Sequence, residues 1–177
     1  MRRSLSRGWG LTTSVNSGRR PSWAELRADP AQLIAFGFGL GKIPAAPGTF
    51  GSLAMLPVYQ WLAPRMEVAS LLALVAVMFA LGVWACDRAG RALGVHDHRG
   101  MVWDEMTAFL LLLSFAPPAL LWQVCAFLLF RLFDVVKPPP IRHLERRFQN
   151  GFGVMLDDLV AAFYTLIVLA AWRALTG

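Results

Sequence analysis

Long uncharged stretches alternate with short polar segments along this chain of 177 residues. Residues 68–86 carry no charge, and their number is close to the roughly 20 that a helix needs to cross the hydrocarbon of a bilayer. Residues 118–130 form a second apolar stretch, and residues 159–172 a third that Arg173 closes. The pattern predicts membrane-spanning helices over the first and third stretches, and over the second only if its helix continues beyond Arg131.

Two further apolar segments, residues 53–63 and 106–116, are too short to span a bilayer at a rise of about 1.5 Å per residue. Prolines at 64, 117 and 118 separate each of them from its longer neighbour. Because proline ends helices, both pairs predict antiparallel helical hairpins. We therefore expect an all-α, polytopic integral membrane protein with about four to five membrane-embedded helices, namely two hairpins and a C-terminal span.

The hairpins place three polar segments, residues 37–52, 87–105 and 131–158, on one side of the membrane. Of the 17 Lys and Arg residues, all but Arg65 and Arg173 then fall on that side. Because basic residues gather on the cytoplasmic side of membrane proteins, the polar segments are predicted to face the cytoplasm.

Composition supports this class of protein, because 56% of the residues are hydrophobic and only 16% are charged, against about 25% charged in soluble domains. Residues 1–29 carry six arginines against Glu25 and Asp29, which predicts a basic, flexible N-terminal arm near anionic lipid. Residues 30–177 are then a single membrane domain. Nucleic-acid binding is not expected, since interleaved aromatic and basic residues are lacking.

Six of the 11 acidic residues stand beside the apolar runs: Asp97, Asp104, Glu105, Asp134, Asp157 and Asp158. A carboxylate next to hydrocarbon loses hydration, so a cation, a hydrogen-bond network or a chemical role must compensate. Adjacent aspartates at 157 and 158 repel each other, and the oxygen-rich pair at 104 and 105 suits Mg²⁺ or Mn²⁺. Helix capping by single carboxylates is the alternative. His96 and His98 are expected to be solvated loop residues.

Candidate phosphate ligands lie in two of the polar segments. Lys42, Thr49 and Ser52 belong to a glycine-rich loop that could bring donors to an anion, although a tight loop leading into a helix would look the same. Arg131 and Lys137 flank Asp134 at three residues' distance. That spacing fits either a local ion pair or a phosphate bridged to a metal.

Four motifs occur in order along most of the chain. They are Gly39-x-Gly41-x-x-Pro44-x-Ala46-Pro47-Gly48-Thr49-x-Gly51-Ser52, Val102-x-Asp104-Glu105, Phe130-Arg131-x-x-Asp134-x-x-Lys137-Pro138-x-Pro140-Ile141 and Gly153-x-Met155-x-Asp157-Asp158. In these motifs the chain resembles the phosphatidylglycerophosphatase A family, membrane enzymes that remove the phosphate from phosphatidylglycerophosphate. The resemblance implies a Mg²⁺-dependent lipid phosphate phosphatase of the bacterial cytoplasmic (inner) membrane, with an all-helical fold and a phospholipid substrate.

Hydrolysis of a phosphate ester needs a metal, cations around the phosphate and a nucleophile, and the polar segments offer all three. We predict that the Mg²⁺ ligands come from Asp104, Glu105, Asp157 and Asp158. Phosphate contacts are expected from Lys42, Thr49, Ser52, Arg131 and Lys137. Asp97 or Asp134 is expected to act on the nucleophile, either water or an aspartate. The alternatives are a membrane cation-binding or transport protein, with the acids along a cation path, or another lipid-phosphate phosphatase.

Overall fold

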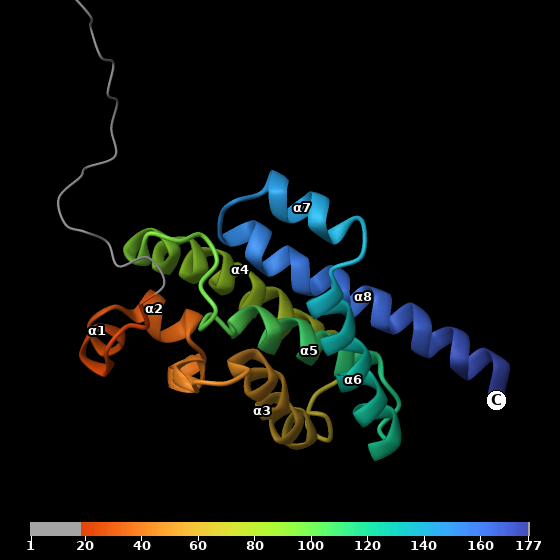
Figure 1. The fold of residues 1–177 in the computed structure, drawn as a ribbon. Coiled ribbons are helices and arrows are strands. Elements are labelled where there is room, and N and C mark those ends of the chain that lie inside the picture. Colours follow the sequence, from red (N-terminus) through yellow and green to blue (C-terminus); the bar gives the residue numbers. More distant parts are fainter. Residues whose placement is uncertain (1–18, 177) are drawn as a thin grey trace, which may run out of the picture.

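The computed structural model describes residues 19–176, apart from the side chains of residues 145, 146 and 176. Within this part of the chain every regular element is a helix, which confirms the predicted all-α class (Figure 1). The elements in order are α1 (Trp23–Ala28), α2 (Pro30–Ala35), the 3₁₀ segment η1 (Gly37–Lys42), α3 (Pro47–Leu62), α4 (Val68–Leu93), α5 (Trp103–Phe115), α6 (Leu120–Val136), α7 (Ile141–Arg147) and α8 (Gly151–Thr176).

The short helix α5 lies at the centre of the fold, where α3, α4 and α8 pack around it (Figure 1). It has 13 residues, and its apolar side chains point in every direction around the helix axis. Such a helix is stable only when other elements enclose it. Phe109, Leu110 and Leu113 are fully buried in this core. The enclosed α5 therefore fixes the positions of the residues in its own first turn.

The packing differs from the first of the two predicted hairpins, which paired residues 53–63 with residues 68–86. Helix α3 packs mainly on α5, and α4 packs mainly on α2, α5 and α8, although α3 and α4 are consecutive. Gly51 permits the close approach of α3, since a Cβ there would lie only 3.1 Å from Val102 Cβ. Helix α5 offers apolar surface on all sides, so α3 buries its side chains against α5 and not against α4.

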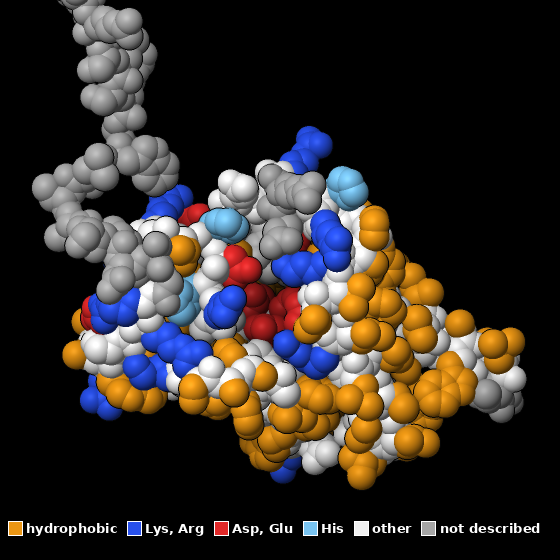
Figure 2. Space-filling view, viewed as in Figure 1, with side chains coloured by type: hydrophobic (Ala, Val, Ile, Leu, Met, Phe, Trp, Pro, Cys, Tyr) orange, Lys and Arg blue, Asp and Glu red, His pale blue; other side chains and the backbone are white. Residues whose placement is uncertain are grey.

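Two helices, α4 and α8, are long and apolar enough to cross a membrane, which supports a membrane protein with two candidate spans. Each has 26 residues, or about 39 Å of helix, and so exceeds the roughly 30 Å of bilayer hydrocarbon. Large apolar side chains such as Val77, Leu128 and Phe163 are exposed on α4, α6 and α8. The hydrophobic surface visible in Figure 2 would face lipid. The predicted total of four to five embedded helices stays a prediction.

The structure describes only the second part of the predicted N-terminal arm, residues 1–29, and the arm as a separate unit stays a prediction. Residues 1–18 lie outside the described residues, but α1 is an ordered helix with a fully buried side chain, Leu26. Ser22 and Glu25 form a capping box that starts α1. The capping box and Leu26 are the sequence signals of this helix. The high arginine content of the segment indicated a flexible arm instead.

Candidate active site

The six acidic residues beside the apolar runs meet in one cavity of about 180 Å³. They come from four places: the loop after α4, the first turn of α5, the last turn of α6 and the N-terminal half of α8. Figure 2 shows these side chains as an acidic hollow with Lys and Arg side chains around it. The residues that line the cavity are Asp97, His98, Arg99, Met101, Asp104, Glu105, Asp134, Lys137, Val154, Asp157 and Asp158.

Three of these carboxylates form a compact group. Asp104, Glu105 and Asp158 each offer an oxygen atom, and these atoms all lie within 4.8 Å of one another. The first two residues stand in the first turn of α5, where the helix dipole favours negative charge. Asp158 reaches the same point from α8, which packs on α5. Two rigid helices thus hold the three groups together.

The three carboxylates are buried, and some of their oxygens lack a hydrogen-bond partner. Asp104 is 7% exposed and Asp158 is 5% exposed. Among the described residues, neither Glu105 Oε2 nor Asp158 Oδ2 has a hydrogen-bond partner. Buried carboxylate oxygens are normally paired, and clustered ones are typical ligands of hard divalent cations such as Mg²⁺. The donor set therefore fits a divalent cation bound by Asp104, Glu105 and Asp158.

Burial and like charge also make the carboxyl groups of α5 weak acids. Burial raises the pKa of Asp104 well above its usual range, and the neighbouring Glu105 adds to the effect. Burial likewise raises the pKa of Glu105 to about 8, with Asp158 as the next contributor. Without a cation the cluster therefore retains protons near neutral pH, whereas a bound cation would displace them.

Asp157 and Lys137 have a different arrangement. Lys137 Nζ lies 3.5 Å from Asp157 Oδ2, so this ion pair links the end of α6 to α8. Lys137 ends α6 in the left-handed conformation, with φ of 46°. Both residues line the cavity, but Asp157 does not belong to the compact group. Its predicted role as a metal ligand stays a prediction.

Arg131 bridges two of the acids. Its Nη1 lies 2.8 Å from Asp134 Oδ2 and 3.7 Å from Glu105 Oε1. The local ion pair that the spacing indicated is thus present between Arg131 and Asp134. The contact with Asp134 is short, but Nη1 makes no aligned hydrogen bond with it. The guanidinium therefore adds positive charge beside the carboxylate group.

The residues picked from the glycine-rich loop do not line the cavity. Lys42 Nζ donates a hydrogen bond to the Pro21 carbonyl oxygen at 2.6 Å and lies over the Trp23 ring. Ser52 is fully buried, and its hydroxyl donates to the Gly48 carbonyl oxygen. Thr49 is half-buried near the start of α3. Both donors thus contact protein acceptors, and the predicted phosphate contacts of Lys42, Thr49 and Ser52 stay predictions.

The loop contributes to the site through its backbone instead. Any side chain at Gly48 would collide with the Glu105 carboxylate, and it would also approach Arg131. The start of α3 therefore lies directly against the acidic group. Only glycine permits this contact without displacing Glu105.

Four lining residues were not predicted as site residues: the apolar Met101 and Val154, and the polar His98 and Arg99. His98 is only 4% exposed, so its predicted placement as a solvated loop residue is wrong. Its ring lies 5.3 Å from the Phe36 ring, and Nδ1 accepts a hydrogen bond from the Gly100 N–H. Arg99 lines the cavity and also an adjoining pocket of about 420 Å³ that Arg20 borders. The proximity of Arg99 to three acids in the sequence was the available signal.

The fold and the cavity together define a class: helical membrane proteins with a buried carboxylate site suited to a divalent cation. The family model named phosphatidylglycerophosphatase A matches residues 33–173. The chain therefore belongs to the phosphatidylglycerophosphatase A family.

Two curated relatives carry the family name. Phosphatidylglycerophosphatase A of Haemophilus influenzae is 44% identical over 145 residues, which cover 81% of this chain and 88% of the relative. The Escherichia coli protein of the same name is 37% identical over 144 residues, covering 80% and 83%. A Bacteroides thetaiotaomicron relative with the provisional name phosphatidylinositol-3-phosphatase is 36% identical over 166 residues, covering 90% and 99%. No solved structure matches.

The family match and the first two relatives assign this chain its activity. It is a hydrolase that dephosphorylates phosphatidylglycerophosphate and so acts in phosphatidylglycerol biosynthesis. The family match confirms the predicted phosphatase function and favours it over the transport alternative.

Proposed function

We propose that the acidic cavity is the active site at which this chain hydrolyses the phosphate monoester, and that Mg²⁺ is the cation it uses. The observation that carries the proposal is the compact group of Asp104, Glu105 and Asp158, with buried oxygens that lack hydrogen-bond partners. When bound there, Mg²⁺ would neutralise charge on the phosphate and polarise its phosphorus–oxygen bonds.

The residues around this group divide the remaining tasks. Arg131 holds a phosphate oxygen through Nη1, because this atom is buried and has no aligned hydrogen bond of its own. Asp134 keeps the guanidinium in place at 2.8 Å, which makes it a positioning residue. Asp97 is exposed at the mouth of the cavity and is the carboxylate that acts on the nucleophile. Lys137 adds a second cation on the α6 side.

The surroundings of the cavity support a membrane-bound anionic substrate. Arg20 and Arg99 border the adjoining pocket, where they can attract the phosphodiester of a lipid headgroup. Helices α4 and α8 would anchor the protein in the bilayer so that the cavity lies at the membrane surface. The distribution of basic residues favours the cytoplasmic surface of the inner membrane.

An assay of phosphate release tests the proposal. The purified full chain in detergent micelles should release inorganic phosphate from phosphatidylglycerophosphate in Mg²⁺, because the cation completes the site. Release should stop in EDTA and resume when excess Mg²⁺ is added. Circular dichroism spectra in EDTA and in Mg²⁺ serve as the control for folding. Unchanged release after exhaustive EDTA treatment would contradict the Mg²⁺ site, and no release by folded, Mg²⁺-loaded protein would contradict the activity.

A further inference from the structure

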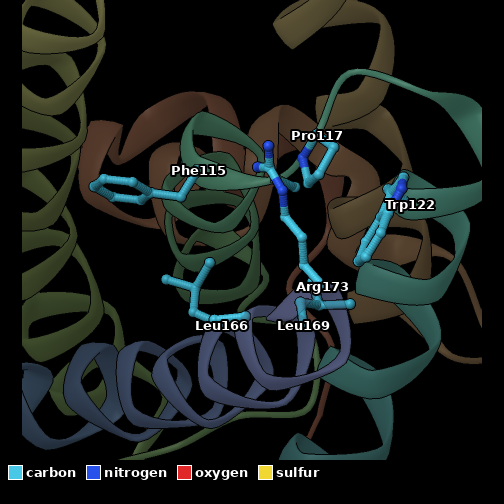
Figure 3. Close-up of a pocket in the computed structure, with 8 residues that line it drawn as sticks. Phe115, Pro117, Trp122, Leu166, Leu169 and Arg173 are labelled. Carbon is cyan, nitrogen blue, oxygen red and sulfur yellow. The ribbon is translucent and has the colours of Figure 1, made fainter. Parts of the chain in front are cut away.

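A second pocket lies between the α5–α6 turn and the C-terminal part of α8, away from the acidic cavity. Its volume is about 260 Å³, and Figure 3 shows its walls. The side chains that matter for its chemistry are Phe115, Pro117, Trp122, Leu166, Leu169 and Arg173. All except Arg173 are apolar, so the pocket is an apolar groove with one exposed positive charge.

The pocket lies at the opposite end of α8 from the carboxylates. Arg173 follows Asp158 by 15 residues, which corresponds to about 22 Å along a helix. If α8 spans the bilayer, the acidic cavity and this pocket lie near opposite membrane surfaces. The rings of Trp122 and Trp172 pack together here, with centroids 5.1 Å apart. Tryptophan is enriched at the level of lipid headgroups, which agrees with this depth.

The charge of Arg173 is not compensated within the described part of the protein. No ion pair or hydrogen bond joins its side chain to another described residue, and no carboxylate lines the pocket. In Figure 3 the Arg173 side chain extends from α8 towards the turn at Pro117. A snorkelling arginine would need only water and headgroups around it. Here the guanidinium stands instead over a concave apolar surface, the arrangement that a headgroup with an attached acyl chain requires.

We propose that this pocket binds an anionic phospholipid from the leaflet opposite the acidic cavity. The guanidinium of Arg173 holds the lipid phosphate through charge-assisted hydrogen bonds. One acyl chain lies against Trp122 and Leu169. The absence of a carboxylate from the pocket wall disfavours a zwitterionic lipid, since its ammonium group would find no partner. The inference does not depend on the chemistry of the acidic cavity.

Native mass spectrometry of the full chain with added phosphatidylglycerol tests the inference. We expect Arg173→Ala to reduce the retained lipid at least about 5-fold, because a charge-assisted contact to phosphate is lost. Arg65→Ala is the matched control. It removes the other basic residue predicted on this side, and Arg65 packs on the Trp61 ring outside the pocket. It should leave lipid retention unchanged. Any lipid bound in the acidic cavity would add equally to the retained lipid of the wild type and of both arginine variants.

A second variant distinguishes the contribution of the pocket to lipid binding from that of the Arg173 charge. Ala170→Phe should fill the pocket while Arg173 stays in place, and it should reduce retention to a similar extent. Melting temperatures of both variants check that the fold is intact. Retention by Arg173→Ala equal to that of the control would overturn the inference. So would equal retention of phosphatidylethanolamine by the wild-type chain, or a dimer that the Ala170→Phe variant abolishes, since the occupant would then be a second copy.

Discussion

Replacement of Asp158 by asparagine or of Glu105 by glutamine is expected to lower phosphatase turnover by at least about 100-fold, because each change removes a charged oxygen from the proposed cation site. The same variants should melt at a higher temperature than the wild type in EDTA. Each relieves the repulsion that develops among the three buried carboxyl groups as they lose their protons towards pH 8, since their oxygens lie within 4.8 Å of one another. Phosphate release and thermal melting in detergent measure the two effects.

The combination of lost activity and raised stability distinguishes a cation site from a structural cluster. Glu67→Gln is the matched control, since Glu67 is an exposed carboxylate just before α4 and far from the cavity lining. It should change neither quantity. If Asp158→Asn and Glu105→Gln keep wild-type turnover, these acids are structural. If both destabilise the protein in EDTA, the carboxylates are compensated by the protein itself.

The second large effect concerns pH. Glu105 has its pKa raised to about 8 in the folded protein, above its unfolded value of about 4.5. The folded state therefore holds a proton that the unfolded state releases above pH 4.5. This contribution to stability is complete below about pH 4.5 and is lost as the pH rises towards 8. The raised pKa of Asp104 acts in the same direction.

In EDTA the melting temperature should consequently fall between pH 5 and pH 8. Each unit of pKa shift corresponds to about 1.4 kcal/mol, so the decrease should be several degrees. Mg²⁺ should restore stability more at pH 8 than at pH 5, because it replaces protons on the same oxygens. Glu105→Gln should flatten the profile measured in EDTA. A melting temperature in EDTA that does not change over this range, with Mg²⁺ equally effective at both pH values, would contradict this account.

The grouping of the six acids was predictable because the sequence places each of them beside a long apolar run, where a carboxylate loses hydration. A carboxylate beside a long apolar run needs compensation, and chain reversals between the apolar runs return the polar segments to one surface. The structure brings all six into one cavity, although α3 and α4 do not form the closed hairpin that was predicted. The shared site therefore requires only that the polar segments return to one place, not that consecutive helices pair.

The details that were missed depend on contacts between distant segments. The sequence shows that Lys42 is a donor, but it does not show that the Pro21 carbonyl oxygen accepts its hydrogen bond. His98 is polar and lies in a loop, yet the Phe36 ring from the end of α2 covers it. The role of Gly48 depends on the approach of α3 to Glu105. Tertiary packing decides all three, and no local pattern records it.

The location of the acids within the helices also bears on function. Asp104 and Glu105 stand in the first turn of α5, and Lys137 caps the end of α6. These parts of the site thus border helix ends, while Asp157 and Asp158 lie about two turns inside α8. None of them lies midway along a broken helix, where transporters place their ions. This agrees with a phosphatase that meets its lipid substrate at the membrane surface.

The most direct test of the central claim is to locate the cation. Crystals of the full chain, grown with Mn²⁺ in place of Mg²⁺, should show an anomalous scattering peak inside the acidic cavity. The peak should lie about 2.2 Å from carboxylate oxygens of Asp104, Glu105 and Asp158, because Mn²⁺ accepts the same oxygen ligands as Mg²⁺. An active, Mn²⁺-loaded preparation whose anomalous peak lies elsewhere, with these three carboxylates not bound to the ion, would contradict the account.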